Sequence, residues 1–181
     1  MPVDKITIVL GALGVGIGLG LQNIVNNFVS GIILIFDRPL QIGDIVEVGS
    51  HSGRVREIGL RSSTLATNDG AEVIIPNGDI LSGQIVNWTL TNNQRRLEMD
   101  LGIRGSSDME QVAAVLKQSV LQSGYAVKER EPQILFTKMH DDGFALKLFY
   151  WCADVSKSEE SKSEVLILLK ENLEKNNLAM E

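Results

Sequence analysis

The pattern of hydrophobic and polar positions divides the chain into three stretches. In the first, residues 6–36 carry no charged side chain, and polar residues cluster only near the middle, at Gln22, Asn23, Asn26, Asn27 and Ser30. As one straight helix this stretch would be roughly 46 Å long, which exceeds the ~30 Å hydrocarbon core of a bilayer. We therefore expect two helices in series: residues 5–22 cross the membrane, and residues 24–36 form an amphipathic half along its surface.

The ends of these helices follow from a few residues. Asn23 and Gly31 are the expected bend points, because both residue types weaken helix continuation. Pro39 disfavours helix at Arg38, so the helix should end at this point. Arg38 also puts a positive charge just outside the apolar stretch, which marks that end as cytoplasmic. Residues 1–38 are thus predicted to form a membrane segment.

From Leu40 the hydrophobic period changes to two, which is typical of strands. Short strands are expected at residues 44–48, 53–58, 62–66, 72–75 and 85–88, with turns at 49–53 and 68–70. Five short strands joined by tight turns predict a small all-β barrel or sandwich of the SH3/Sm type over residues 39–91.

The third stretch, residues 92–181, alternates strand and helix periods. Strands are expected at 96–103, 133–139 and 144–151, and amphipathic helices at 108–122 and 159–176; Ser107 and Glu110 are placed like a capping box. The resulting β-α-β-β-α order is most of a ferredoxin-like split unit, an α+β domain that can bury one core.

Glycine is concentrated in the membrane segment, where it forms two stripes. Gly11, Gly14 and Gly18 make one stripe, and Ala12, Gly16 and Gly20 make the other. Because a glycine costs roughly 1 kcal/mol relative to alanine in an exposed helix, this segment needs neighbours to hold it. Two smooth stripes predict two neighbours, as in a head-to-tail ring of identical helices.

The branched residues Ile8, Val15 and Leu19 share a third face of this helix. If that face looks down the ring axis, Val15 and Leu19 form a narrow apolar constriction that excludes water and therefore ions until it widens. The alternative is that these side chains face lipid in a packed anchor. The pattern alone leaves both interpretations open.

Charge and cysteine content narrow the class of protein. The formal charge is −6, and residues 97–181 hold 15 acidic against 10 basic side chains. No basic tract favours nucleic acid, and the arginines of an Sm-like RNA binder are few: Arg54, Arg56 and Arg61, which we expect to pair with acids or lie near lipid head groups. The single cysteine, Cys152, allows no internal disulfide and is expected to be buried.

The residue types of catalytic and metal sites are present but not suitably arranged. His51 and His140 are far apart and have no zinc-like spacing, so a surface or loop position is expected for each. No three glycines fit the dinucleotide-binding spacing, and no phosphate-loop lysine follows them. Asp141 and Asp142 are more typical of a solvated turn than of a cation site. We expect no enzyme activity, no cofactor and no metal.

Several longer segments closely resemble one family. These are GVGIGLGLQNIVNNFVSGIILIFDRPLQIGDIVEV, GRVREIGLRSSTLATNDGAEVIIPNGDI and IVNWT. They are similar to the small-conductance mechanosensitive channels (MscS), including the MscK-like members. The resemblance implies a homoheptameric channel of the bacterial inner membrane, whose last membrane helix lines the pore and whose residues after 38 lie in the cytoplasm.

The resemblance also implies roles for single residues. The family's two gate leucines fall on Val15 and Leu19, and its two kink glycines on Asn23 and Gly31. Its packing stripes fall on the same small residues, Ala12 and Gly16 on one side and Gly11, Gly14 and Gly18 on the other. The junction motif falls on Arg38, Pro39, Gly43 and Asp44. Val15, Gly16 and Asn23 depart from the family pattern, which affects the closed radius and helix mobility.

The function that the resemblance implies is a tension-gated pore, which releases ions and small osmolytes on hypoosmotic shock and contacts membrane lipid. Family members carry further membrane helices before the pore helix and a C-terminal barrel after the last helix, so we expect this sequence to be a piece of a longer chain. The acidic excess favours cations in the vestibule. The alternative function is a membrane-anchored oligomeric scaffold, or a ligand-modulated channel, whose vestibule binds a regulator.

Overall fold

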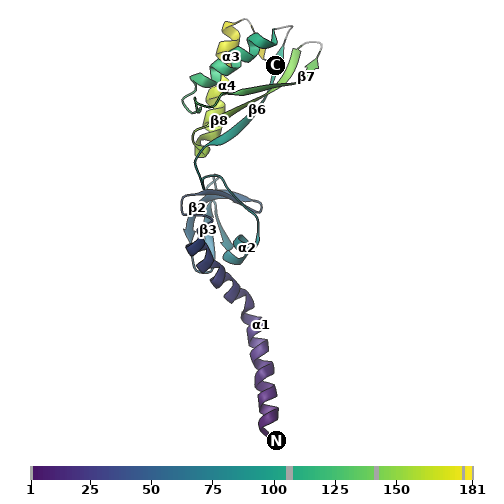
Figure 1. The fold of residues 1–181 in the computed structure, drawn as a ribbon, viewed down its shortest axis with the longest axis vertical. Coiled ribbons are helices and arrows are strands. Elements are labelled where there is room, and N and C mark those ends of the chain that lie inside the picture. The colour runs from purple at the N-terminus through teal and green to yellow at the C-terminus, as the bar shows by residue number, and fades with distance from the viewer. Residues whose placement is uncertain (1, 105–107, 141–142, 177, 181) are drawn as a thin grey trace. The chain divides into compact units, whose positions relative to one another are not determined.

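The computed structural model describes residues 2–104, 108–140, 143–176 and 178–180. The chain forms two compact units, Met1–Leu90 and Thr91–Glu181, each with its own hydrophobic core. Figure 1 labels the elements of both units. The units are described separately below.

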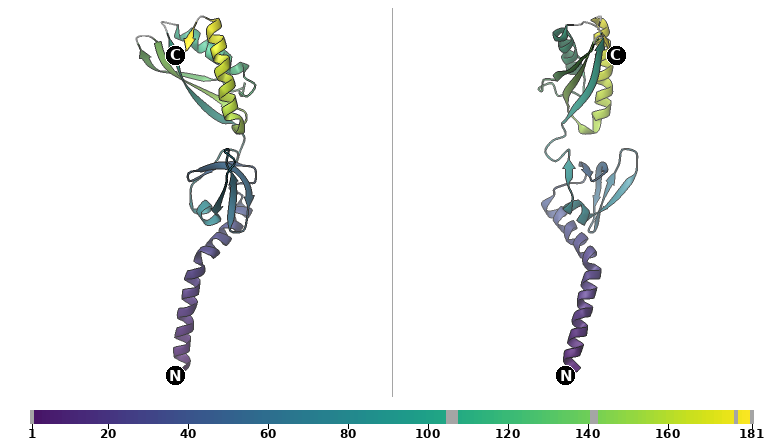
Figure 2. Two further views of the ribbon diagram at one scale, coloured as in Figure 1. Left: turned by 180° about the vertical axis from the view of Figure 1, so that it is seen from behind. Right: turned by 90° about the vertical axis from the view of Figure 1, so that its right-hand side faces the viewer.

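A single long helix, α1 (Pro2–Asp37), begins the first unit. The expected split into two helices is wrong, since the helix continues through Asn23 and Gly31. Asparagine and glycine only weaken a helix, and the Asn27 side chain donates a hydrogen bond to the Asn23 carbonyl (2.8 Å). The ribbon does change direction partway along α1 (Figure 2). The helix ends as predicted, because Arg38 adopts a left-handed φ of 50°.

The all-β fold predicted for the next stretch is confirmed, as an antiparallel sheet in the order β4-β3-β2-β1-β5. Its strands are β1 (Ile45–Val48), β2 (His51–Ile58), β3 (Ser62–Ala66), β4 (Glu72–Pro76) and β5 (Ile85–Asn87). The first turn is tighter than expected, because Val48 pairs with His51 and leaves a two-residue loop. A short helix, α2 (Asn77–Ser82), was not predicted.

The core of this unit is built from alternate strand residues and from one face of α1. Val46, Val55 and Leu65 alternate with exposed or half-buried neighbours and are fully buried. Leu34 of α1 and Ile80 of α2 join the same cluster. The end of α1 therefore contributes one face to the core of the β domain.

The second unit has the predicted β-α-β-β-α order, with one strand more. Its elements are β6 (Arg95–Arg104), α3 (Met109–Gln122), β7 (Gln133–His140), β8 (Gly143–Cys152), a 3₁₀ turn (Val155–Lys157), α4 (Ser158–Lys175) and β9 (Ala179–Met180). The sheet order is β7-β8-β6-β9. Along β8 buried residues alternate with half-buried ones, so the helices cover one face and leave the other open.

The residue that caps α3 differs from the predicted one. The N-cap of α3 is Asp108, whose carboxylate accepts a hydrogen bond from the Glu110 backbone N–H at 3.0 Å. The predicted cap, Ser107, lies outside the described residues, as do Asp141 and Asp142. Cys152 is fully buried, as expected.

Candidate functional site

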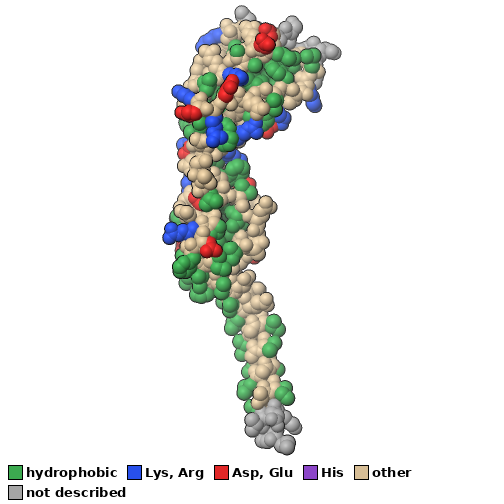
Figure 3. Space-filling view, in the orientation of Figure 1, with side chains coloured by type: hydrophobic (Ala, Val, Ile, Leu, Met, Phe, Trp, Pro, Cys, Tyr) green, Lys and Arg blue, Asp and Glu red, His purple; other side chains and the backbone are tan. Residues whose placement is uncertain are grey.

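The first half of α1 has no packing partner within its own chain. Ile6–Asp37 is long and apolar enough to cross a membrane. The side chains of Val15 and Leu19 are 64% and 69% exposed. Hydrophobic side chains alternate with bare backbone along the helix (Figure 3). Only groups outside this chain can bury these surfaces.

The two stripes of small residues are equally open. A Cβ atom added at Gly11, Gly14, Gly16, Gly18 or Gly20 would meet no atom of the chain within 4 Å. Nothing inside the chain therefore requires glycine at these positions. A close approach by another helix would require it, because small residues let helix backbones come together.

The second half of α1 has one face against the β domain and one open face. Asn27, Ser30, Gly31 and Leu34 follow helical spacing, and all but the half-buried Asn27 are buried. The opposite face carries exposed apolar side chains, among them Val29, Ile32 and Phe36. This half is amphipathic, as predicted, and its polar positions contact the β domain.

Gly31 lies at the closest approach between α1 and the β domain. A Cβ at this position would lie 2.5 Å from Nδ2 of Asn77 and closer still to the Leu60 carbonyl oxygen. The contact excludes every other residue type unless the backbone shifts. The structure thus gives Gly31 a packing role that the sequence did not indicate, and its role as a bend point stays a prediction.

A buried asparagine organises the contact. Asn77, at the start of α2, is fully buried; its Nδ2 donates to the Gly59 carbonyl (2.9 Å), and its Oδ1 accepts from Oγ of Ser63 (2.8 Å). Its backbone N–H donates to the Arg61 carbonyl at 3.0 Å. Buried polar groups are costly unless they are paired, and here each is satisfied. Asn77 therefore ties the β2–β3 turn to α2.

A second asparagine joins α2 to α1. The backbone N–H of Gly78 donates to Oδ1 of Asn27 at 2.8 Å. A Cβ at Gly78 would lie 2.8 Å from the Asn26 amide nitrogen, so this position also requires glycine or a shift of that side chain. The polar cluster of α1 is thus a joint with the β domain. Sequence reasoning missed the joint because its partners lie about 50 residues apart.

The predicted junction residues link α1 to the sheet. Gly43 has a left-handed φ of 98°, and its N–H donates to the Val55 carbonyl at 2.8 Å. The Asp44 carboxylate accepts hydrogen bonds from the Gln41 N–H (2.8 Å) and from Nδ2 of Asn87 (2.7 Å). Arg38 is exposed and Pro39 is half-buried. Gly43 and Asp44 form a hydrogen-bonded turn at the start of the sheet.

The three arginines of the β domain differ in their surroundings. Arg56 forms an ion pair with Glu72, as expected, whereas Arg54 donates to the Gly43 carbonyl at 2.7 Å. Arg61 lines a cavity of about 210 Å³, together with Asn23 and Asn27 of α1. This cavity places the predicted bend residue Asn23 beside the joint.

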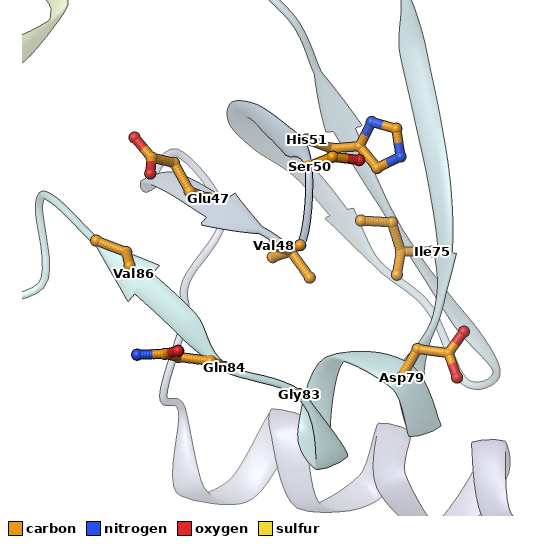
Figure 4. A pocket seen from close by; sticks show the side chains of 10 residues that line it. Glu47, Val48, Ser50, His51, Ile75, Asp79, Gly83, Gln84 and Val86 are labelled. Atoms are coloured by element: carbon orange, nitrogen blue, oxygen red, sulfur yellow. The ribbon is translucent and has the colours of Figure 1, made fainter.

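A larger hollow lies elsewhere in the β domain (Figure 4). It measures about 490 Å³; Val48, Ile75 and Val86 line it, and His51 and Asp79 lie at its rim. His51 is exposed, as expected, but it begins a strand rather than lying in a turn. Across the described ranges, no three histidine, cysteine or acidic side chains come together in a group that could hold a metal.

Two family models match the chain in its order of domains. Residues 23–90 match the β-domain of mechanosensitive ion channels, and residues 97–180 match the C-terminal domain of the mechanosensitive ion channel MscS. Together the two matches cover both compact units.

Curated relatives agree with these matches. The mechanosensitive channel MscK of Escherichia coli is 42% identical over 134 residues, which are 74% of this chain and 12% of that protein. The small-conductance mechanosensitive channel of Edwardsiella ictaluri is 35% identical over 137 residues, 76% of this chain and 43% of that protein. The chain thus spans well under half of the length of these relatives.

Solved structures share the fold. The closed state of MscS from Helicobacter pylori superimposes with a TM-score of 0.88 at 24% identity, over 99% of this chain and 70% of that one. MSL1 of Arabidopsis thaliana gives a TM-score of 0.81 at 23% identity, over 100% of this chain and 67% of that one. At these identities the likeness speaks for the fold alone.

Proposed function

Because the chain belongs to the MscS family of mechanosensitive ion channels, we propose that it supplies the pore helix and part of the cytoplasmic wall of a tension-gated channel. Channels of this family form homo-oligomers and are not enzymes. We propose a heptamer in a bacterial inner membrane, with residues 1–38 as the membrane segment. Residues 39–91 and 92–181 form the cytoplasmic domains. Ions and small osmolytes are the permeating species.

The main support for this proposal is the exposure of the first half of α1. Within a single chain, both of its small-residue stripes and its branched side chains have no packing partner. In a head-to-tail ring, Gly11, Gly14 and Gly18 of one copy face Ala12, Gly16 and Gly20 of the next. Val15 and Leu19 then face the axis, where two rings of aliphatic side chains exclude water from a narrow passage. The passage is closed to ions without a plug.

Opening depends on the difference in membrane area between the closed and the open channel. Membrane tension favours the wider state, because its in-plane area is larger. The α1 helices slide along their small-residue stripes, the rings of Val15 and Leu19 separate, and water enters. Asn23 and Gly31 are the proposed bend points, and Arg38, Pro39, Gly43 and Asp44 form the junction at the membrane surface. The acidic excess of the second half favours cations in the vestibule.

The alternative function is a membrane-anchored oligomeric scaffold, which assembles in the same way but conducts no ions and binds a regulator in its vestibule. Liposomes that contain the chain and a self-quenching anionic dye distinguish the two after osmotic downshock. We expect dye release, and we expect Gly16→Leu to abolish it, because the larger side chain blocks a stripe. An assembled chain that releases no dye would favour the scaffold.

A further inference from the structure

Two arginines stack on aromatic rings of one strand, on the open face of the sheet in the second unit. The guanidinium carbon of Arg96 lies 4.2 Å from the centre of the Phe149 ring, and that of Arg130 lies 4.1 Å from the Trp151 ring. Phe149 and Trp151 are two residues apart on β8, so their side chains share a face about 7 Å apart. The stacking therefore places both guanidinium groups on this face of the sheet.

Two carboxylates that neighbour these arginines, on the strand face or in sequence, bind lysines instead. Glu98, on the same face as Arg96, pairs with Lys147, and it is the main cause of the raised pKa of Lys147. Glu131, next to Arg130 in sequence, accepts a hydrogen bond from Lys117 at 2.6 Å, which lowers the pKa of Glu131.

Neither arginine forms an ion pair within the described part of the chain. Glu129, the other neighbour of Arg130, is exposed and pairs with no described cation. Arg96 donates one hydrogen bond, from Nη2 to Oε1 of Gln133 at 2.8 Å, which orients its guanidinium plane. The remaining N–H groups of both arginines are available to a ligand.

The geometry suits a particular ligand chemistry. A guanidinium group is a planar fork that binds a carboxylate through two parallel hydrogen bonds, and stacking on a ring fixes the fork in advance. Two such forks, stacked on rings at neighbouring positions of one strand face, can each take one carboxylate of a molecule whose two carboxylates are joined by a short carbon chain. The half-buried ring edges between them provide an apolar surface for that chain.

We propose that Arg96 and Arg130 form a binding site for small organic dicarboxylates on the open face of this sheet. For this half of the chain, the sequence predicted only that its acidic excess favours cations in the vestibule. Its existence does not depend on the proposed channel function. In a conducting channel the site would raise the local concentration of organic anions near the cytoplasmic wall.

Succinate is the probe, and Trp151 is the reporter. The full chain in detergent carries Trp88→Phe, so that its remaining tryptophan lies in the site. We expect succinate to change the tryptophan emission saturably. Arg96→Gln and Arg130→Gln should each weaken binding about tenfold, and Arg130→Lys should not restore it, since lysine lacks the fork. Lys138→Gln, which removes a charge from a neighbouring strand, is the matched control.

Three outcomes would overturn the site. Equal weakening by Lys138→Gln would mean general attraction between charges. Phosphate or chloride binding as tightly as succinate at the same ionic strength would remove the carboxylate assignment. Absence of binding by equilibrium dialysis would remove the site altogether. Dye release from liposomes is measured on the same variants, so that a failed site with intact release leaves the channel function standing.

Discussion

Glycines serve two different purposes in this chain. Gly31 and Gly78 are required by contacts inside the first unit, where a Cβ would overlap Asn77 or Asn26. Gly11, Gly14 and Gly18 meet no contact inside the chain. The first group is explained by contacts within one chain, whereas for the second we propose contacts with neighbouring subunits. The two groups therefore predict different kinds of mutational effect.

Leu19→Ser tests the gate. A hydroxyl on the constriction lowers the cost of wetting it, so we expect the channel to open at lower membrane tension. Patch recordings from liposomes measure the threshold. Leu10→Ser, on the opposite side of the helix, is the matched control and should leave the threshold unchanged. Equal thresholds for Leu19→Ser and the unaltered chain would argue against this gate.

Gly31→Ala tests the closest contact of α1 with the β domain. The added methyl group overlaps the Leu60 carbonyl and the Asn77 amide, and overpacking of this kind costs about 1–3 kcal/mol. We expect a lower midpoint of thermal unfolding for the first unit. Gly20→Ala, on the same helix, meets no packed neighbour within 4 Å and should not lower the midpoint. A Gly31→Ala chain as stable as the original would mean that the contact relaxes freely.

At the scale of elements, α1 combines two environments in one continuous helix. Its first half is open on all sides, and its second half is part of the core through Leu34. The joint of Asn27 with Gly78 and of Gly31 with Asn77 lies in the second half. Through these contacts, a displacement of the second half of α1 would also displace α2 and the β2–β3 turn.

Asn27→Ala tests this joint. The change removes the acceptor of the Gly78 N–H, a hydrogen bond of about 0.5–1.5 kcal/mol. Because the bond restrains the second half of α1, we expect its loss to lower the opening tension. Asn26→Ala is the control, since it removes a neighbouring amide without that bond. A threshold that moves equally in both variants would assign the effect to local polarity.

Tyr150 makes the second unit sensitive to alkali. It is buried on β8, its hydroxyl lies 3.0 Å from Oγ of Ser161 on α4, and burial raises its pKa to about 12. The unfolded chain ionises near pH 10, so between about pH 10 and pH 12 the folded state holds the extra proton and stability falls as the pH rises. Tyr150→Phe should remove this loss, as measured by denaturant unfolding at both pH values. An unchanged slope in Tyr150→Phe would assign the loss to other groups.

At the scale of the whole molecule, the two cores have no buried residue in common. Leu65 belongs to the first core and Leu148 to the second, and both are fully buried. We therefore expect two unfolding transitions. Leu148→Ala should lower the free energy of unfolding of the second unit by about 2–5 kcal/mol, and Leu65→Ala should lower that of the first unit. Calorimetry in detergent measures both. A single transition that both variants shift would show that the units unfold together.

Much of the architecture follows from the sequence. The periods of 3.6 and 2 predicted the helices and strands of both domains except the short α2 and β9, because burial on one face imposes those periods. The strand at Ser62–Ala66 was predicted to the residue, and the end of α1 followed from Pro39. The motifs indicated the family, which the comparisons confirm. The gate and packing residues stay predictions, since the partners proposed for them lie in other copies.

Tertiary structure alone decided the joint and the arginine pair. Asn27 and Gly78 are 51 residues apart, and Arg130 and Trp151 are 21 apart, so no local period brings them together. The helix also continues through the exposed Asn23, whose carbonyl accepts a hydrogen bond from the Asn27 side chain. The sequence by itself determined which elements form and which faces are apolar. The tertiary structure determined which polar groups that are distant in sequence bind each other, because each buried polar group needs a hydrogen-bond partner.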